Sequence, residues 1–256
     1  MIDLHCHILP GLDDGPTDMR HSVEMAAQAD RDGIHTICAT PHIRHDHDVR
    51  IHELPDRIAV LNEAIAQAGG AAHIISGGEV AETIVEHLSD AELRVVSLGG
   101  GGRWILLEPK PGPLSDSLDH AVVTLRRRGF HSLIAHPERH LGVDMLERLA
   151  RLVREGALIQ ATAATMCEPP ASRGMAILAR AGLIHVLSSD AHHPRVGREV
   201  AIAEGLQVLG RIDPPGQFLP WVRDVAPAAM IAGEEVASPY PPEGIPPPAK
   251  DGATAG

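Results

Sequence analysis

The chain repeatedly places a histidine or a carboxylate directly after a short apolar run of strand-forming residues. It opens with MIDLHCH, in which His5 and His7 are two residues apart. Alternate residues of a strand point to the same face, so both imidazoles project together from the strand end. Further examples are TPH at 40–42, GGE at 77–79, LEP at 107–109, AHP at 135–137 and SDAH at 189–192. One such histidine is more often a satisfied core residue than a ligand, but the recurrence predicts a polynuclear metal centre and hence a hydrolase.

Apolar strand-like runs alternate with helical patterns along the chain. The predicted strands are 2–6, 34–40, 72–77, 103–108, 131–135, 157–162 and 184–189. The predicted helices are about 17–32, 53–68, 80–88, 115–129, 144–155, 173–181 and 196–209. Gly33, Gly129, Gly156 and Gly182 each lie between a helix and a strand, where a left-handed helix C-cap is expected. Because the strands are almost continuously apolar, they predict a parallel sheet covered by helices.

The polar residues fall at the carboxyl ends of the predicted strands, which favours a closed α/β barrel with its site at that end. A doubly wound open sheet is the alternative, but it would not gather ligands from every strand. A last helical segment is expected over 213–237. From Ser238 onward the chain is rich in Pro, Gly and Ala. We therefore predict one domain over 1–237 and a disordered tail over 238–256 that catalysis does not need.

The charge and the cysteine count exclude several classes of protein. The net charge of −12 and the lack of a basic run argue against a nucleic-acid partner. The three cysteines form neither an even disulfide set nor a zinc-finger spacing, so reduced intracellular thiols are expected. No apolar run approaches the roughly 20 residues of a membrane helix, and we expect no membrane insertion. These features predict a cytoplasmic enzyme.

The residue types at the strand ends indicate which metals and which chemistry to expect. Mixed histidine and carboxylate ligands suit Mn, Fe or Zn, and not Ca or Mg alone. Thiolates are absent from the strand ends, which argues against a structural zinc site. A carboxylate such as Glu79 or Glu108 is able to bridge two ions. Clustered ions lower the pKa of a bound water and clamp an anionic substrate.

Other charged residues near these motifs have two interpretations each. Arg139 and Arg195 follow the histidines at 136 and 192, and guanidinium groups bind phosphate bidentately. The alternative for both is a salt bridge on a solvated loop. Asp13 and Asp14 form an Asp-Asp-Gly turn that is ordinarily turn and cap chemistry. Because this turn directly follows His7, one aspartate is expected to fold back onto the metals, and we favour Asp14.

Two segments have the C-x5-R spacing of cysteine-dependent phosphatases, and we interpret both as chance. They run from Cys38 to Arg44 and from Cys167 to Arg173. That mechanism needs a loop of free backbone N–H groups around the phosphate. Proline removes one of these groups from the first segment and two from the second, and neither segment contains glycine.

The chain resembles the PHP (polymerase and histidinol phosphatase) superfamily, specifically the CpsB/CapC-type manganese-dependent protein-tyrosine phosphatases of bacteria. The segment DLHCHILPGLDDG at 3–15 is similar to the signature of that subfamily and is the most specific part. The segments ATPH (39–42), LEP (107–109), AHPER (135–139) and SDAH (189–192) are similar as well. The resemblance covers about residues 1–237.

The resemblance implies a distorted seven-stranded (β/α)7 TIM-like barrel that holds three divalent ions, with manganese expected. The implied ligands are His5, His7, Glu79 and Asp190 for one ion, Glu79, Glu108 and His136 for a second, and Asp14, His42 and His192 for the third. Two departures from the family pattern concern the substrate rim. Arg195 comes only three residues after His192, so Arg198 is the alternative phosphate ligand. The run QATAAT at 160–165 replaces the more usual Gln-x-Thr-x-Gly-Ser.

The implied reaction is hydrolysis of a phosphomonoester by in-line attack of a metal-bound hydroxide. Arg139, with Arg195 or Arg198, would neutralise the developing charge. Family analogy implies a phosphotyrosine protein as substrate, namely a tyrosine kinase that controls capsule or exopolysaccharide export. A small-molecule phosphatase, such as one for histidinol phosphate, is the alternative within the same fold. Two alternatives belong to other classes: an amidohydrolase-type C–N hydrolase, and a non-catalytic binding module whose fold is stabilised by metal.

Overall fold

Two sheets of parallel strands form the centre of the computed structural model, which describes residues 1–240 except 141, 143 and 170. The part of the predicted tail from 241 onward lies outside the described residues. The first sheet has the order β1-β2-β4, and the second has the order β3-β5-β6-β7-β8-β9. The strands are β1 (Ile2–Cys6), β2 (Thr36–Ala39), β3 (His42–Ile43), β4 (His73–Ile75), β5 (Glu79–Ala81), β6 (Trp104–Glu108), β7 (His131–Ile134), β8 (Leu158–Thr162) and β9 (Val186–Ser188).

Two of the predicted strands are followed by an interruption and a further short strand. Proline at position 41 carries no N–H and separates β2 from β3. Gly77 and Gly78 separate β4 from β5 at a point where the chain comes close to its neighbours. A Cβ on Gly78 would lie 2.8 Å from Val96, so only glycine fits there without movement. These breaks turn the chain at the positions that precede His42 and Glu79.

Backbone hydrogen bonds join the strands across the boundary between the two sheets. The amide of Asp190, just after β9, donates to the carbonyl of His5 over 2.8 Å, and the amide of His7 donates to that of Ala191 over 2.9 Å. On the other side of β1, the amide of Thr40 donates to the carbonyl of Cys6 over 3.0 Å. The end of β1 therefore lies between the ends of β9 and β2.

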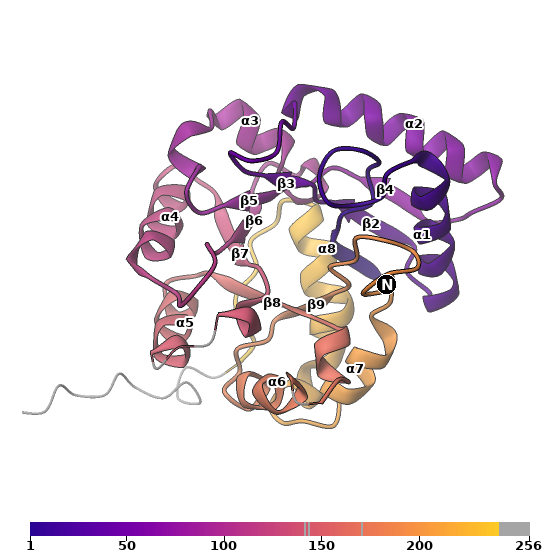
Figure 1. Cartoon of the computed structure of the whole chain (residues 1–256). Helices are drawn as coiled ribbons and strands as arrows, with labels where there is room; N and C mark the ends of the chain where they lie inside the picture. Colours follow the sequence, from indigo (N-terminus) through magenta and orange to yellow (C-terminus); the bar gives the residue numbers. More distant parts are fainter. Residues whose placement is uncertain (141, 143, 170, 241–256) are drawn as a thin grey trace, which may run out of the picture.

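Most of the helices cover the outside of the strands, whereas the last one packs on their inner side (Figure 1). The helices are α1 (Met19–Asp32), α2 (Leu54–Gln67), α3 (Asp90–Val95), α4 (Asp116–Arg127), α5 (Met145–Arg154), α6 (Ala171–Arg180), α7 (Ala203–Leu209) and α8 (Ala226–Ile231). Gly33, Gly129, Gly156 and Gly182 all have positive φ, as predicted for residues between a helix and a strand.

Three of the predicted helices differ from the structure. The helix predicted at 80–88 is wrong, because β5 and a 3-10 helix at Val85–His87 take its place. Helix α3, which was not predicted, begins with a capping box between Ser89 and Glu92. The helix predicted at 196–209 begins only at Ala203. The last segment is broken into a 3-10 helix at Pro215–Phe218, a π-helical turn at Trp221–Val225 and α8.

Side chains of the strands pack alternately inward and outward. In β6, Trp104 and Leu106 belong to an inner cluster with Met230 of α8, whereas Ile105 and Leu107 belong to the larger cluster under the outer helices. Helix α8 accordingly lies in the middle of the strands in Figure 1. It packs against residues at which strands begin, such as Ile2 of β1 and Trp104 of β6. None of the helices in the described ranges is long and apolar enough to cross a membrane.

Candidate metal centre and anion-binding cavity

All nine predicted metal ligands meet at the carboxyl ends of the strands. They form overlapping groups whose ligand atoms lie within 4.8 Å of one another: His7, Asp14, His42 and His192; His5, His7 and Asp190; His5, Glu79 and His136; and His42, Glu79 and Glu108. Most of these side chains are buried, whereas that of Asp14 is 60% exposed. The buried candidates at the strand ends therefore form the inner part of the group, and Asp14 lies on its solvent-exposed side.

The ring nitrogens of His5 and His7 are arranged as an ion requires. The Nδ1 atom of His5 donates to the amide oxygen of Gln160 over 3.1 Å, and Nδ1 of His7 donates to Asp13 over 2.8 Å. In this tautomer both Nε2 atoms carry lone pairs, yet they lie only 3.1 Å apart. Two lone pairs at that distance repel each other unless a proton or a metal ion is bound beside them.

Glu79, at the start of β5, is the common neighbour of the histidines. Its Oε2 lies 3.3 Å from Nε2 of His5, 3.2 Å from Nε2 of His7 and 3.0 Å from Nδ1 of His42. Its Oε1 lies 2.7 Å from Nε2 of His136. Burial opposes the charge of this carboxylate, but the surrounding histidines hold the pKa of Glu79 well below its usual range. Glu79 is therefore a negative charge at the centre of the group.

Several buried ligand atoms have no hydrogen-bond partner among the described residues. They include Oε2 of Glu79, Oδ1 of Asp190 and Nδ1 of His42. Buried polar atoms are normally satisfied, so each such atom calls for an explanation. All three point into the same group of ligands, and divalent ions bound there would satisfy them. The donor set, nitrogen from histidine and oxygen from carboxylates, suits ions such as Mn, Fe or Zn.

The same charges act on the histidines. Burial opposes protonation of His7, but its contacts with Asp13 and Glu79 raise its pKa to about 9. Burial opposes protonation of His42 as well, but its contacts with Glu108 and Glu79 raise its pKa to about 9. The centre thus favours positive charge, which either protons or metal ions supply.

Asp13 and Asp14 have different positions. Asp14 lies 3.5 Å from Nε2 of His42 and 3.4 Å from Nε2 of His192, beside two of the other predicted ligands. Neither aspartate caps the following helix, because Asp18 is the N-cap of α1. The turn interpretation holds for Asp13, whose Oδ1 accepts the amide of Gly15 over 2.9 Å. Asp13 accepts hydrogen bonds from Nδ1 of His7 and from the amide of His42. It therefore orients the ring of His7 and positions the backbone of His42. Its contact with His7 could not be read from the sequence.

The ligand groups differ in detail from those implied by the family pattern. His136 lies with His5 and Glu79, whereas Glu108 lies with His42 and Glu79. His7 also joins the group of Asp14, His42 and His192. Two ligand candidates have backbone angles that non-glycine residues rarely adopt, with φ of 28° at His136 and 51° at Asp190. Such angles cluster at functional sites, where the fold over-determines them.

A cavity of about 400 Å³ opens beside the metal ligands and carries arginines on its rim. Its lining residues are Asp14, His42, Arg44, Glu108, Arg139, His192, Val196, Gly197 and Arg198. Arg139 forms an ion pair with Asp190. Arg198 donates from Nε to the carbonyl oxygen of Asp190 over 2.9 Å, and its Nη2 lies 3.1 Å from the carboxylate. Arg44 was not predicted for this site, and it donates to Glu108 over 3.2 Å.

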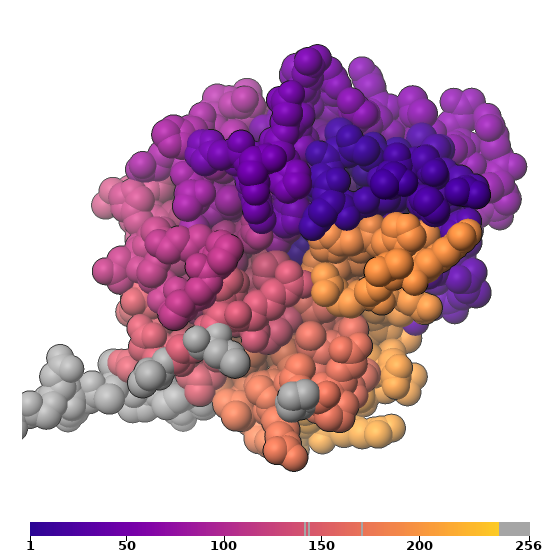
Figure 2. Space-filling view, in the orientation of Figure 1, coloured from indigo at the N-terminus to yellow at the C-terminus, as the bar shows by residue number. Residues whose placement is uncertain are grey.

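Arg195 does not line this cavity. It forms a two-point ion pair with Glu24 on α1, and its side chain is 61% exposed. The neighbouring carbonyl of Pro194 accepts a hydrogen bond from Gln28, which holds this loop against α1. Figure 2 shows the orange segment that contains Arg195 against the indigo N-terminal segment. In this structure Arg195 therefore forms the solvated salt bridge of the alternative interpretation, and Arg198 lines the cavity.

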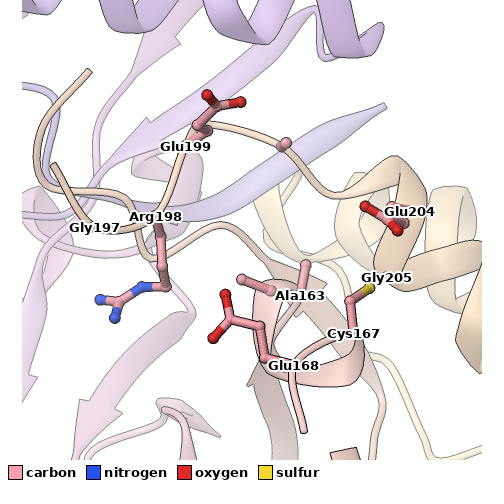
Figure 3. A pocket seen from close by; sticks show the side chains of 10 residues that line it. Ala163, Cys167, Glu168, Gly197, Arg198, Glu199, Glu204 and Gly205 are labelled. Atoms are coloured by element: carbon pink, nitrogen blue, oxygen red, sulfur yellow. The ribbon is translucent and has the colours of Figure 1, made fainter. Parts of the chain in front are cut away.

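A second cavity, of about 310 Å³, lies on the other side of Arg198 (Figure 3). Glu168, Glu199 and Glu204 line it together with Cys167. Burial raises the pKa of Cys167 above its ordinary value. The other cysteine with a C-x5-R spacing, Cys38, is fully buried, and burial raises its pKa to about 12. Neither thiol is therefore poised as a thiolate nucleophile.

Comparison with known proteins gives consistent results. The model of a family described as "Capsular polysaccharide synthesis, CpsB/CapC" matches residues 1–212. The tyrosine-protein phosphatase YwqE of Bacillus subtilis is 32% identical over 217 residues, which are 82% of this chain and 84% of that protein. The putative tyrosine-protein phosphatase CapC of Staphylococcus aureus is 27% identical over 199 residues, or 75% of this chain and 77% of that protein.

Solved structures agree with the sequence comparison. A structure from work on YwqE of Bacillus subtilis and CpsB of Streptococcus pneumoniae, described as unique metal-dependent tyrosine phosphatases, has a TM-score of 0.81 and 30% identity. The match covers 98% of this chain and 100% of that chain. Dihydropyrimidinase from Brevibacillus agri shares the fold alone, with a TM-score of 0.51 and 12% identity over 91% of this chain and 70% of that chain.

Proposed function

We propose that this chain, which belongs to the CpsB/CapC family of capsular polysaccharide synthesis proteins, is a metal-dependent protein-tyrosine phosphatase. The observation that carries the proposal is the set of nine metal-ligand candidates beside Arg139 and Arg198. Nitrogen and oxygen ligands that converge in this way suit a cluster of divalent ions, and paired guanidinium groups suit a phosphate. The relatives that are named as tyrosine-protein phosphatases support the same conclusion.

We further propose that the two sheets form one distorted seven-stranded (β/α)7 barrel. In this description β2 and β3 are one strand interrupted at position 41, and β4 and β5 are one strand interrupted at Gly77 and Gly78. The hydrogen bonds between the ends of β9 and β1 support closure. A closed barrel would present every strand end to one site, which accounts for ligands that come from all around the ring.

The proposed cofactor is a cluster of three divalent ions, with manganese favoured and iron or zinc as alternatives. By the family pattern, His5, His7, Glu79 and Asp190 would hold one ion, Glu79, Glu108 and His136 a second, and Asp14, His42 and His192 a third. The convergence of all nine residues supports the cluster as a whole, although in this structure His136 groups with His5 and Glu79, and Glu108 groups with His42 and Glu79. The distances around Glu79 support its role as a bridging ligand. When bound, such ions lower the pKa of a coordinated water and withdraw charge from phosphate oxygens.

The protein residues in this proposal bind and orient the phosphate. Arg139 and Arg198 both contact Asp190 and remain partly exposed to the cavity, so a phosphate that enters is within reach of their N–H groups. Guanidinium groups that are partly shielded from water, as these are, attract developing negative charge more strongly than fully solvated groups. A phenolate, whose pKa is near 10, departs more easily than an alkoxide. Phosphotyrosine therefore needs a dedicated general acid less than phosphoserine does.

The proposed substrate is a phosphotyrosine protein, namely an autophosphorylated tyrosine kinase of capsule or exopolysaccharide export. The family description and the names of the relatives support it. We also propose a cytoplasmic location, in which the three free cysteines would stay reduced.

The proposal is tested with purified protein that has been stripped of metal and reloaded with manganese. We expect turnover of a phosphotyrosine peptide and of p-nitrophenyl phosphate, with much less turnover of histidinol phosphate. His5→Ala and His136→Ala should each lower the turnover of both substrates about a hundredfold or more, since several kcal/mol of charge stabilisation depend on the ions. His120→Ala, which changes an exposed histidine away from the site, is the matched control. A clear preference for histidinol phosphate, or full activity of His5→Ala, would contradict the proposal.

A further inference from the structure

An apolar cavity of about 500 Å³ lies next to the catalytic cavity and shares Arg139 with it. It opens between the 3-10 helix at Pro137–Arg139, the start of α5 and one face of α6. Met145 of α5 and Leu178 of α6 are buried side chains of its wall, and Ala171 adds a small apolar side chain. A mostly apolar hollow with few polar groups is typical of a binding site rather than of a packed core.

Gly174 gives this cavity part of its open space. It lies within α6, where glycine is less favourable than alanine, and its φ is not positive. A Cβ built on Gly174 would have no heavy atom within 4 Å outside its own helix backbone. Neither the backbone angle nor close packing therefore requires glycine here. What the missing side chain does leave is free space in the wall of the cavity.

One end of the cavity is polar. Glu138 accepts a hydrogen bond from the amide of Thr162 through Oε1, while its Oε2 is buried without a partner in the described part of the chain. Thr165 lines the same cavity, with its hydroxyl donated to the carbonyl of Thr162. An unsatisfied carboxylate oxygen at the edge of an apolar hollow is able to accept an N–H group from an occupant and fix its orientation.

We propose that this cavity binds an apolar side chain of the substrate protein, a few residues from the phosphotyrosine. The inference rests on the proposed function, which requires that a polypeptide lies across the mouth of the catalytic cavity. Arg139 forms a common wall of the two cavities, and an extended peptide advances about 3.3–3.6 Å per residue. A phosphotyrosine in the first cavity therefore brings a nearby side chain to the second. The cavity would select protein substrates by sequence and would not affect small phosphate esters.

The test uses the full-length, manganese-loaded protein and a set of seven-residue phosphotyrosine peptides. The peptides consist of alanine and serine, and a single leucine is moved through the three positions on either side of the phosphotyrosine. For the wild-type protein we expect one position of leucine to lower KM about tenfold, as expected for a few methylene groups in an apolar pocket. Gly174→Leu should abolish this preference by filling the cavity.

Gly174→Ala is the matched control, because it removes the same glycine but leaves most of the cavity open and should keep the preference. Both substitutions favour the helix, so both variants should fold, and thermal unfolding checks this. Hydrolysis of p-nitrophenyl phosphate should be the same for all three proteins. If KM does not depend on the leucine position, or if Gly174→Leu keeps the preference, the inference is wrong while the proposed function stands. If no peptide is hydrolysed although histidinol phosphate is, both are wrong.

Discussion

At the scale of single residues, Asp13 determines how His7 faces the centre. It accepts the Nδ1 proton of His7 over 2.8 Å and also accepts the amides of His42 and Gly15. The carboxylate fixes the tautomer in which Nε2 of His7 points to the other ligands. Burial opposes the charge of Asp13, but these hydrogen bonds hold its pKa well below the usual range. The negative charge of Asp13 is therefore stabilised beside His7, which is a ligand candidate.

We expect Asp13→Asn to weaken manganese binding by about 10- to 100-fold, because an amide holds His7 less firmly and leaves it less basic. Isothermal titration calorimetry of the metal-stripped protein measures the effect. Asp18→Asn is the control, since Asp18 caps α1 and does not touch the ligands. Equal manganese affinity of Asp13→Asn and wild type would show that Asp13 does not support the site.

The two arginines after His192 provide a second comparison between residues. Arg198 lines the cavity beside the ligand candidates, and Arg195 is paired with Glu24 on the surface. We expect Arg198→Ala to lower kcat/KM for p-nitrophenyl phosphate by about 10²-fold, as for loss of one donor to a developing charge. Arg195→Ala should stay within about twofold of wild type. A larger loss for Arg195→Ala than for Arg198→Ala would reverse the assignment.

Single residues also show how far the sequence predicts the site. The nine ligand candidates could be found because each follows an apolar strand, except Asp14, which the resemblance singled out. Arg44 and Asp13 were missed as site residues because their roles depend on loops whose course the sequence does not determine. Arg198 was left as an alternative to Arg195, because spacing alone does not say which arginine of a loop turns inward.

At the scale of elements, Asp3 and Ser189 connect the first and last strands. The buried carboxylate of Asp3 accepts hydrogen bonds from the amide and the hydroxyl of Ser189, over 3.1 Å and 2.5 Å. Burial raises the pKa of Asp3, and these hydrogen bonds oppose that shift. The contact lies within two residues of His5 and Asp190, so the same pair places ligands from opposite ends of the chain.

We expect Ser189→Ala to lower the free energy of unfolding by about 1–3 kcal/mol, because Asp3 would lose a hydrogen bond in a buried position. Ser188→Ala is a close control, since the Ser188 hydroxyl is buried in the last residue of β9 without a partner in the described structure. That change should be neutral or stabilising. Urea unfolding of both variants measures the difference. A larger loss for Ser188→Ala would mean that packing of β9, and not the bond to Asp3, is responsible.

Elements were predicted well where local pattern decides their structure. The runs at 2–6 and 103–108 are β1 and β6 within one residue, because their apolar residues are continuous and their ends are marked. The helix predicted at 80–88 failed because β5 is only three residues long and is held by β3 and β6 on either side. Pairing between distant strands, and not the local preference of 79–81, determines its structure.

At the scale of the whole molecule, residues 238–240 return to the start of β9. The ligand candidates lie at the opposite, carboxyl ends of the strands. Ser238 accepts a hydrogen bond from Nε2 of His185 over 2.9 Å, and the Tyr240 hydroxyl donates to the carbonyl of Ile184 over 2.6 Å. Tyr240 is buried. These residues belong to the segment predicted as a tail, because a composition rich in proline does not reveal the contact of one tyrosine with a distant strand.

His185 makes this end of the molecule sensitive to acid. Its Nδ1 accepts the amide proton of Ile159 over 3.2 Å, and its Nε2 donates to Ser238, so the neutral ring is fully satisfied. Burial lowers the pKa of His185 to about 3. In the unfolded chain a histidine has a pKa near 6.5. Between that pH and the lower pKa of the folded state, the unfolded chain binds a proton at His185 and the folded chain does not. The free energy of unfolding should therefore fall as the pH decreases below about 6.5, by about 1.4 kcal/mol per pH unit until the folded pKa is reached.

We expect His185→Gln to remove this contribution, because a glutamine amide offers an acceptor and a donor but does not titrate. Urea unfolding of both proteins at pH 7, 6 and 5 gives the two pH profiles, and groups common to both, the metal ligands included, cancel in their difference. The wild-type free energy should drop more steeply than that of the variant, by about 1.2 kcal/mol between pH 6 and pH 5. Parallel profiles would mean that His185 takes up its proton in the folded protein, which requires that the residues around Ser238 and Tyr240 move away and admit water.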